Sequence, residues 1–401
     1  MSHEDFQRWI NDVMPKIIKN LGSDIDKVRY ELPKFTDTFI MSNMYRVRLQ
    51  FENKTNKQNE ELSIIMKRPM PGFSQLARID LQFYNEILFY QMYTRPNEIY
   101  AKCIYAEDRP PNDSVIALEN VNGRGYYSCP CVYNPSLEYT LAAMRELGRF
   151  HGKGYVMKEM QPEKFFDIVE RIQEVRYTKT AENLYEFQSN IKSVRAVEYL
   201  RSQGHDTVFC DKMEALLSNA FDEVMMKTVQ PQEPLATLCH GDFTLDNILF
   251  KTEDNGQYRP MLIDFALIRY STPVIDLSTH LFLSCTNEMR KSKFSEIMRA
   301  YYDALKEYLL DAGIQDIEKY SYNALLDDFR RGALFGFILM SVFVPVLLGH
   351  LSPETLVQEI VDLGVVESAK KQKYAGGDEV SKILADALLH LRDLGCLKHF
   401  L

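Results

Sequence analysis

The sequence predicts an α+β protein with a small antiparallel-sheet lobe followed by a larger lobe that is mainly helical. Strand-like segments surround one helical stretch in the first 120 residues, and helical periodicity dominates the remainder. One short β segment, 236–266, interrupts the helical part. We therefore expect an N-lobe over residues 1–120 and a C-lobe over residues 121–401, with a hairpin at 236–266.

The composition is that of an ordinary soluble globular protein, with 46% hydrophobic and 26% charged residues in 401. The formal net charge of −9 argues against a broad nucleic-acid footprint, because nucleic-acid binders usually carry a basic excess. Seven cysteines are sparse, and the close pair Cys129 and Cys131 lacks the two further ligands that a zinc site needs. We expect reduced thiols and a cytoplasmic location.

The small lobe begins with an amphipathic helix, because apolar residues recur at helical spacing over 9–21 and acidic residues exclude a signal peptide. Alternation predicts a strand at 45–51, and a second strand is expected at 62–67, beyond a long polar loop. A helical stripe covers 73–93. Two more short strands are expected near 101–106 and 114–119.

The larger lobe opens with Asn134-Pro135, which reads as a helix cap followed by a first-turn proline. That helix is expected to end near 151–152. Further helical stretches are predicted at 161–200 and 210–228, and helices resume from Asp276.

The segment 333–349 has no charged residue and contains Gly336 and Pro345. It is at the short end of the length that crosses a bilayer, and no second such segment accompanies it. We therefore expect a buried helix and no membrane span, with Arg330 and Arg331 at its solvated end.

The β segment carries the residues most suited to chemistry. Residues 239–250 read Cys-His-Gly-Asp-Phe-Thr-Leu-Asp-Asn-Ile-Leu-Phe, and residues 261–266 read Met-Leu-Ile-Asp-Phe-Ala. Asn255-Gly256 between them is a strong signal for a tight hairpin. A ladder centred on that turn would place Asn247 opposite Asp264, and the two oxygens would suit Mg²⁺.

The spacing of these groups has a mechanistic meaning. In protein kinases a catalytic-loop Asp accepts the substrate proton, an Asn at the fifth position after it binds metal, and a second Asp follows in Asp-Phe-Gly. Here Asp242, Asn247 and Asp264 have these offsets, although Asp and Asn in turns are by themselves uninformative. The combination predicts a phosphotransferase site, with Asp242 as the catalytic base and Asn247 and Asp264 as metal ligands.

These motifs resemble those of the aminoglycoside- and choline-phosphotransferase relatives of protein kinases. The closer resemblance is to the ecdysteroid kinase-like family, also called the CHK-kinase-like family, at His240–Phe250 and at Ile263–Leu277, which reads Ile-Asp-Phe-Ala-Leu-Ile-Arg-Tyr-Ser-Thr-Pro-Val-Ile-Asp-Leu. Similar stretches occur at 83–90, 118–121, 147–151 and 394–397. The resemblance implies a bilobal protein-kinase-like fold. Ala266 departs from the family's usual Gln, which we expect to alter packing and not metal binding.

A kinase-like site needs a cation for the nucleotide phosphates on a small-lobe strand, oriented by a helix glutamate. Lys67 ends the predicted second strand, and Glu86 lies within the predicted helix. Taken alone, each would be an exposed charged residue. Their order before the β segment and the resemblance at 83–90 favour a Lys67–Glu86 pair, with Arg68 as the competing cation.

The phosphate-covering loop is expected in 39–45, where no Gly-x-Gly-x-x-Gly occurs and Ser42-Asn43 marks the turn. The resemblance implies that such a Ser/Asn-containing loop covers the phosphates. The end of the last small-lobe strand is expected to form the interlobe hinge and meet the adenine: Leu118, Glu119 and Asn120.

One histidine and one aspartate are expected to support the site, and a second histidine is expected to pack within its helix. His240 is predicted to brace the loop that presents Asp242, and His151 lies on a helical stripe that is typical of packing. Asp276 has the position of a helix cap, and the resemblance implies that it supports the catalytic loop.

The sequence thus predicts an enzyme that transfers the γ-phosphoryl group of ATP, with Mg²⁺, to the hydroxyl of a small molecule. The resemblance implies a lipophilic alcohol such as an ecdysteroid. Two alternatives remain at this point: a choline- or ethanolamine-type kinase and a catalytically silent nucleotide-binding pseudokinase. No nucleic-acid partner is expected, and the oligomeric state does not follow from the sequence.

Overall fold

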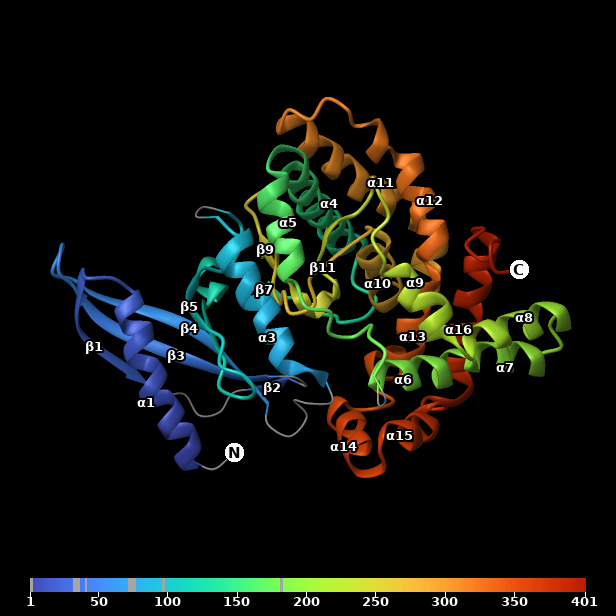
Figure 1. Ribbon diagram of the computed structural model, residues 1–401, viewed down its shortest axis with the longest axis horizontal. Coiled ribbons are helices and arrows are strands. Elements are labelled where there is room, and N and C mark those ends of the chain that lie inside the picture. The colour runs from blue at the N-terminus through green and yellow to red at the C-terminus, as the bar shows by residue number, and fades with distance from the viewer. Residues whose placement is uncertain (1–2, 32–36, 40–41, 71–76, 96–97, 181–182) are drawn as a thin grey trace. The chain divides into compact units, whose positions relative to one another are not determined.

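A computed structural model describes residues 3–31, 37–39, 42–70, 77–95, 98–180 and 183–401 of the chain (Figure 1). The chain divides into two compact units, Met1–Tyr127 and Ser128–Leu401. The boundary expected after residue 120 falls shortly before this division, and β7 (Tyr127–Ser128) spans it.

The first unit is built on an antiparallel sheet with strand order β1-β3-β4-β6-β5, and β2 pairs with β3. Its elements follow in chain order: α1 (His3–Asn20), β1 (Ile25–Glu31), β2 (Asp37–Phe39), β3 (Ser42–Asn53), β4 (Asn59–Pro69), α3 (Ile79–Leu88), a π-helical turn (Phe89–Tyr93), β5 (Cys103–Glu107), β6 (Val115–Glu119) and a 3₁₀ turn (Val121–Arg124).

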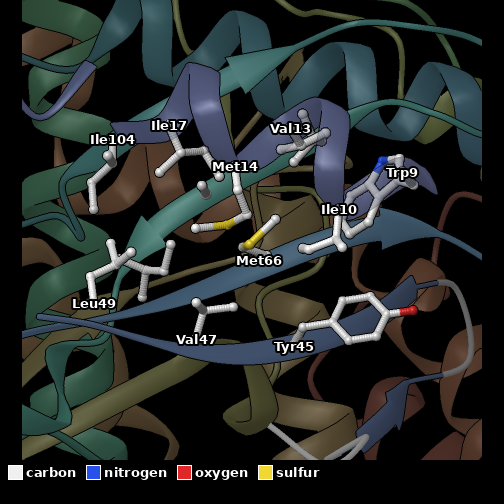
Figure 2. Packing of buried hydrophobic residues seen from close by; sticks show 13 residues of the cluster. Trp9, Ile10, Val13, Met14, Ile17, Tyr45, Val47, Leu49, Met66 and Ile104 are labelled. Atoms are coloured by element: carbon white, nitrogen blue, oxygen red, sulfur yellow. The ribbon is translucent and has the colours of Figure 1, made fainter. Parts of the chain in front are cut away.

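The core of this unit lies between α1 and one face of the sheet, as Figure 2 shows. The helix contributes Trp9, Val13 and Ile17, all buried, and their spacing places them on one face. Tyr45, Val47 and Leu49 of β3 alternate with exposed residues, because successive side chains of a strand point to opposite faces. The amphipathic helix and this strand were both predicted.

The strands differ from the prediction in extent. The polar stretch 52–61 is not a long loop, because Glu52 pairs with Asn59 and only 54–58 connects the strands. Its polar residues lie on the ends of the two strands, where Asn53 Nδ2 donates to Glu60 Oε1 (2.9 Å). Strand β1 was missed because its residues are mostly exposed and an irregularity after Asp26 breaks the alternation.

The structure describes only part of the helix predicted over 73–93. Residues 73–76 lie outside the described part of the chain, and the regular α-helix spans Ile79–Leu88 before the π-helical turn. The strands predicted near 101–106 and 114–119 correspond to β5 and β6.

The second unit is mainly helical. Its helices are α4 (Leu137–Met160), α5 (Pro162–Arg171), α6 (Leu184–Ser193), α7 (Arg195–Ser202), α8 (Thr207–Leu217), a π-helical turn (Phe221–Met225), α9 (Met226–Thr228), α10 (Val274–Ser284), α11 (Asn287–Asp311), α12 (Tyr322–Gly332), α13 (Leu334–Leu347), α14 (Pro353–Leu363), α15 (Val365–Gln372) and α16 (Gly377–Asp393), with 3₁₀ turns at Leu245–Asn247 and Glu318–Tyr320. Short strands interrupt them: β8 (Thr237–Cys239), β9 (Ile248–Thr252), β10 (Tyr258–Leu262) and β11 (Arg269–Ser271).

Helix α4 is longer than predicted, and its glycines explain why. A Cβ on Gly152 would lie 3.0 Å from Tyr308 of α11, and one on Gly154 would clash with Thr237 of β8. These glycines therefore permit close packing and do not end the helix. The helix begins after Ser136, so the predicted cap at Asn134 was also wrong. The predicted stretch 161–200 is broken between α5 and α6.

Helix α13 is the uncharged segment at 333–349, and most of it is buried. A Cβ on Gly336 would lie 2.4 Å from the carbonyl oxygen of Ser278, so glycine lets α13 approach α10 closely. Arg330 and Arg331 before it are exposed. In the described part of the chain no single helix is long and apolar enough to cross a membrane; only Glu318–Gly332 and Leu334–Leu347 together, bent by 52°, meet that criterion.

Candidate active site

The loop after β8 is held by one buried carboxylate. Asp276, in the first turn of α10, accepts hydrogen bonds from the backbone N–H of His240 (2.6 Å) and of Gly241 (2.8 Å). Burial alone would raise the pKa of Asp276, but the hydrogen bond from His151 and the loop amides keep that pKa below its usual value. The prediction that Asp276 caps its own helix was wrong. Pro273 stands at the cap position of that helix, and the Asp276 side chain binds the loop instead.

His240 and Gly241 fix the shape of this loop. His240 is fully buried, and its Nε2 lies 3.0 Å from the carbonyl oxygen of Ile263. Gly241 has a φ of 82°, and a Cβ there would lie 1.9 Å from the carbonyl oxygen of Leu267. Only glycine fits this position, so the chain is forced to turn directly before Asp242.

Asp242 stands at the end of the anchored loop with its side chain 33% exposed. Asn247, at the end of the following 3₁₀ turn, donates from Nδ2 to the backbone oxygen of Asp242 (2.9 Å) and to its Oδ2 (3.3 Å). These contacts orient both side chains. Because Nδ2 is used as the donor, the amide oxygen of Asn247 is directed away from Asp242 and can serve as a cation ligand.

The hairpin register differs by one residue from the prediction. Thr252 pairs with Tyr258, so the ladder is centred on Asn255 and not on the bond after it. The backbone N–H of Ile263 accordingly donates to the carbonyl oxygen of Asn247 (3.1 Å), and Asp264 follows one position beyond. Five residues, 253–257, connect the paired strands, whereas the predicted pairing requires an even number, so every pair is shifted by one residue.

Asp264 has a φ of 64°, a left-handed conformation that is uncommon for any residue except glycine. Asp264 comes directly after Ile263, whose N–H makes the last hydrogen bond to Asn247, and its backbone conformation turns the chain away from β10. Such strain persists only where the surrounding structure enforces it, and it is frequent at functional sites.

In the first unit, Lys67 and Glu86 form an ion pair with an Nζ–Oε2 distance of 2.5 Å. Lys67 lies within β4, paired with Met44 of β3 and Ile116 of β6, so it does not end the strand as predicted. The two side chains are 9% and 1% exposed. The competing cation, Arg68, contacts Asp113 (2.6 Å).

The other predicted nucleotide-binding residues lie at strand ends. Ser42 and Asn43 are buried residues at the start of β3, not in a turn, and residues 40–41 lie outside the described part of the chain. Leu118 and Glu119 end β6. Asn120 caps the 3₁₀ turn that follows, accepting from the N–H of Asn122 (3.2 Å).

Arg176 was not predicted from the sequence. Its Nη1 lies 3.7 Å from Oδ1 of Asp242, and its side chain is only 10% exposed. It belongs to the irregular segment between α5 and α6, where no periodicity or motif distinguishes one arginine from another. No sequence signal pointed to Arg176. In the structure, Arg269 of the segment that resembles the kinase-like family pairs with Glu174, two residues before Arg176 (3.1 Å).

The comparison with family models gives one match, to the ecdysteroid kinase-like family over residues 37–314. The chain belongs to this family. The match includes Lys67, Glu86 and the whole segment from Asp242 to Asp276. The comparison with curated proteins gave no match.

Among solved structures, the chain is similar to an ethanolamine kinase from Plasmodium vivax, with 12% identity, a TM-score of 0.46, and coverage of 98% of this chain and 91% of that one. It is also similar to the GDP complex of wild-type aminoglycoside 2'-phosphotransferase-IIIa, with 11% identity, a TM-score of 0.43, and coverage of 95% and 99%. The family and the architecture of an N-terminal sheet with a helical C-terminal part agree with the predicted fold class, a kinase-like α+β protein.

Proposed function

We propose that this member of the ecdysteroid kinase-like family transfers the γ-phosphoryl group of ATP to a hydroxyl group of a lipophilic alcohol such as an ecdysteroid. The observation that carries the proposal is the anchored loop, which presents a partly exposed Asp242 hydrogen-bonded to Asn247. This arrangement supplies a proton acceptor and a polar oxygen ligand within five residues, as phosphoryl transfer requires.

Asp242 is the proposed base. The acceptor oxygen forms a bond to the γ-phosphorus while its proton passes to the Asp242 carboxylate, and the bond from the γ-phosphorus to the bridging oxygen breaks to release ADP. Hydrogen bonding from Asn247 Nδ2 holds one carboxylate oxygen, Oδ2, and leaves the other to receive the proton.

Asn247 and Asp264 are the proposed ligands of Mg²⁺. The donor set fits a hard cation, because it offers an amide oxygen and a carboxylate from adjacent ends of the hairpin strands. When bound, Mg²⁺ would neutralise charge on the nucleotide phosphates. The chain's part is to fix both side chains through the hairpin and the strained backbone at Asp264.

Lys67 is the proposed cation for the nucleotide phosphates, and Glu86 holds it in place. In the middle of the sheet Lys67 has neighbours on two strands, which limits its side chain to a narrow range of positions. We retain Ser42, Asn43 and the chain segment Leu118–Asn120 as nucleotide-binding candidates. The seven free cysteines suit a reducing compartment, so a cytoplasmic location is part of the proposal.

A screen of hydroxylated metabolites tests the proposal. Purified protein is incubated with Mg·ATP and a set that includes ecdysteroids, other sterols, choline, ethanolamine and aminoglycosides. The expected result is a product that gains one phosphate group by mass, formed preferentially from an apolar alcohol. Preferential phosphorylation of choline or ethanolamine would replace the lipophilic acceptor with an amino-alcohol acceptor.

A further inference from the structure

In the helical unit, two tyrosine rings are each covered by the guanidinium group of an arginine. The guanidinium carbon of Arg176 lies 5.0 Å from the centre of the Tyr185 ring, and that of Arg269 lies 4.6 Å from the centre of the Tyr177 ring. Proteins that recognise quaternary ammonium groups do so with such aromatic faces. These two faces are therefore occupied by the protein's own arginines.

The position of Arg176 is fixed by its backbone. Glu174 Oε1 accepts from the N–H groups of Arg176 and Tyr177, both at 2.9 Å, and Asn183 Nδ2 donates to the carbonyl oxygen of Arg176 (3.0 Å). The same glutamate pairs with Arg269 of β11. An arginine held in this way and only 8% exposed is a built part of the site and not a mobile surface charge.

The charge of Arg176 faces the proposed base. With Nη1 at 3.7 Å from Asp242 Oδ1, it balances the carboxylate that would otherwise attract a cationic acceptor. An acceptor whose hydroxyl reaches Asp242 must also approach this guanidinium. A positive charge close to that hydroxyl would be repelled, because two like charges a few ångströms apart in a partly buried site interact strongly.

The surroundings on the other side are apolar. The Tyr177 ring lies 6.1 Å from that of Phe221 and 5.7 Å from that of Phe335 in α13, measured between ring centres, and all three residues are buried. The segment that carries Arg176 is thus packed between the catalytic loop and apolar side chains of the helical unit.

We propose that Arg176 determines the charge of the acceptor, selecting alcohols that are uncharged near the reacting hydroxyl and excluding cationic ones. This inference rests on the proposed function and narrows the class of its substrate. It assigns a specificity role to a residue outside the catalytic motifs.

A matched pair of alcohols tests the role of Arg176. Choline and 3,3-dimethylbutan-1-ol have nearly the same shape, but the first carries a quaternary ammonium and the second a neutral carbon. Dissociation constants for both are measured by saturation-transfer NMR on the Mg·ATP-free protein, and phosphoryl transfer to both is measured separately. The expected wild-type result is weaker binding of choline by at least about tenfold.

Variants separate charge from fold. Arg176→Gln is expected to bring the two dissociation constants to within about threefold of each other, while Arg176→Lys keeps the positive charge and most of the discrimination. The matched control is Arg171→Gln, because Arg171 is exposed at the end of α5 and pairs only with Asp167 among the described residues. It should leave the ratio unchanged.

Three results would overturn the inference. The wild-type protein could bind choline as tightly as the neutral alcohol, it could fail to bind the neutral alcohol, or a folded Arg176→Gln protein could keep the wild-type ratio of the two dissociation constants. Equal wild-type dissociation constants overturn the inference even if that variant does not fold. If binding shows the expected preference but no alcohol is ever phosphorylated, the proposed function fails and the charge selection stands.

Discussion

The two units each contain an ion pair that involves a predicted site residue, and the pairs differ in kind. Lys67 and Glu86 are 2.5 Å apart and almost completely buried. Arg176 and Asp242 are 3.7 Å apart, beyond hydrogen-bonding distance, and the Asp242 side chain is one third exposed. The first pair is closed against water, whereas the second leaves its carboxylate accessible.

The difference indicates two tasks. A buried pair with short contacts fixes a lysine in one position and tolerates no change of charge, because a single buried charge is costly. A carboxylate that is oriented by Asn247 but still reached by solvent can exchange a proton with a substrate. Loss of either residue of the first pair should therefore harm stability, whereas loss of Asp242 should harm catalysis alone.

The largest effect is expected at Asp242. Asp242→Asn removes the proton acceptor but keeps the side-chain size, so kcat should fall by about 10²- to 10⁴-fold. Mg·ATP binding, measured by calorimetry, should remain close to wild type because the base is not a proposed metal ligand. Turnover near the wild-type rate would remove Asp242 from its role.

Breaking the buried pair should chiefly change stability. Lys67→Met leaves Glu86 buried and uncompensated, which should lower the free energy of unfolding by about 3–5 kcal/mol. The double variant Lys67→Met/Glu86→Leu should recover much of that loss but not nucleotide binding. Urea unfolding and calorimetry measure the two quantities; a stable double variant that still binds ATP would contradict the role of Lys67.

Metal binding gives a graded test. At nucleotide concentrations about 100-fold above Kd, Mg·ATP should stabilise the wild-type protein by about 2.7 kcal/mol. This stabilisation should vanish in Asp264→Ala and only weaken in Asn247→Ala, because a carboxylate binds a hard cation more strongly than an amide does. Thermal melts with and without Mg²⁺ measure it. Equal stabilisation of all three proteins would exclude the assigned ligands.

The smallest effects separate the loop from the hairpin turn. Gly241→Ala must place a Cβ against the Leu267 carbonyl oxygen, so it should destabilise the protein by more than the roughly 1–2 kcal/mol of left-handed strain. Gly256→Ala has a similar φ of 78° with nothing within 4 Å, so it should show the strain alone. Equal losses of unfolding free energy would mean that the loop carrying Asp242 is not tightly packed.

The periodicity of the sequence predicted which kind of element carries each residue of the buried ion pair. Strand alternation and helical spacing placed Lys67 on a sheet and Glu86 on a helix, and the structure joins them. The hairpin was predicted, but its register was wrong because an odd number of connecting residues shifts every pair and no sequence signal fixed the length of the connection. Arg176 reaches Asp242 through tertiary packing of an irregular segment, which periodicity does not describe.

The proposed activity is the transfer of phosphate to an alcohol, which goes beyond the binding of nucleotide. The most direct measurement follows an isotopic label on the γ-phosphorus of ATP in the presence of Mg²⁺ and uncharged lipophilic alcohols. The expected result is label in a phosphate ester of the alcohol, dependent on Mg²⁺ and on Asp242. Label that stays in ATP or appears only as inorganic phosphate, while Mg·ATP binds, would contradict it.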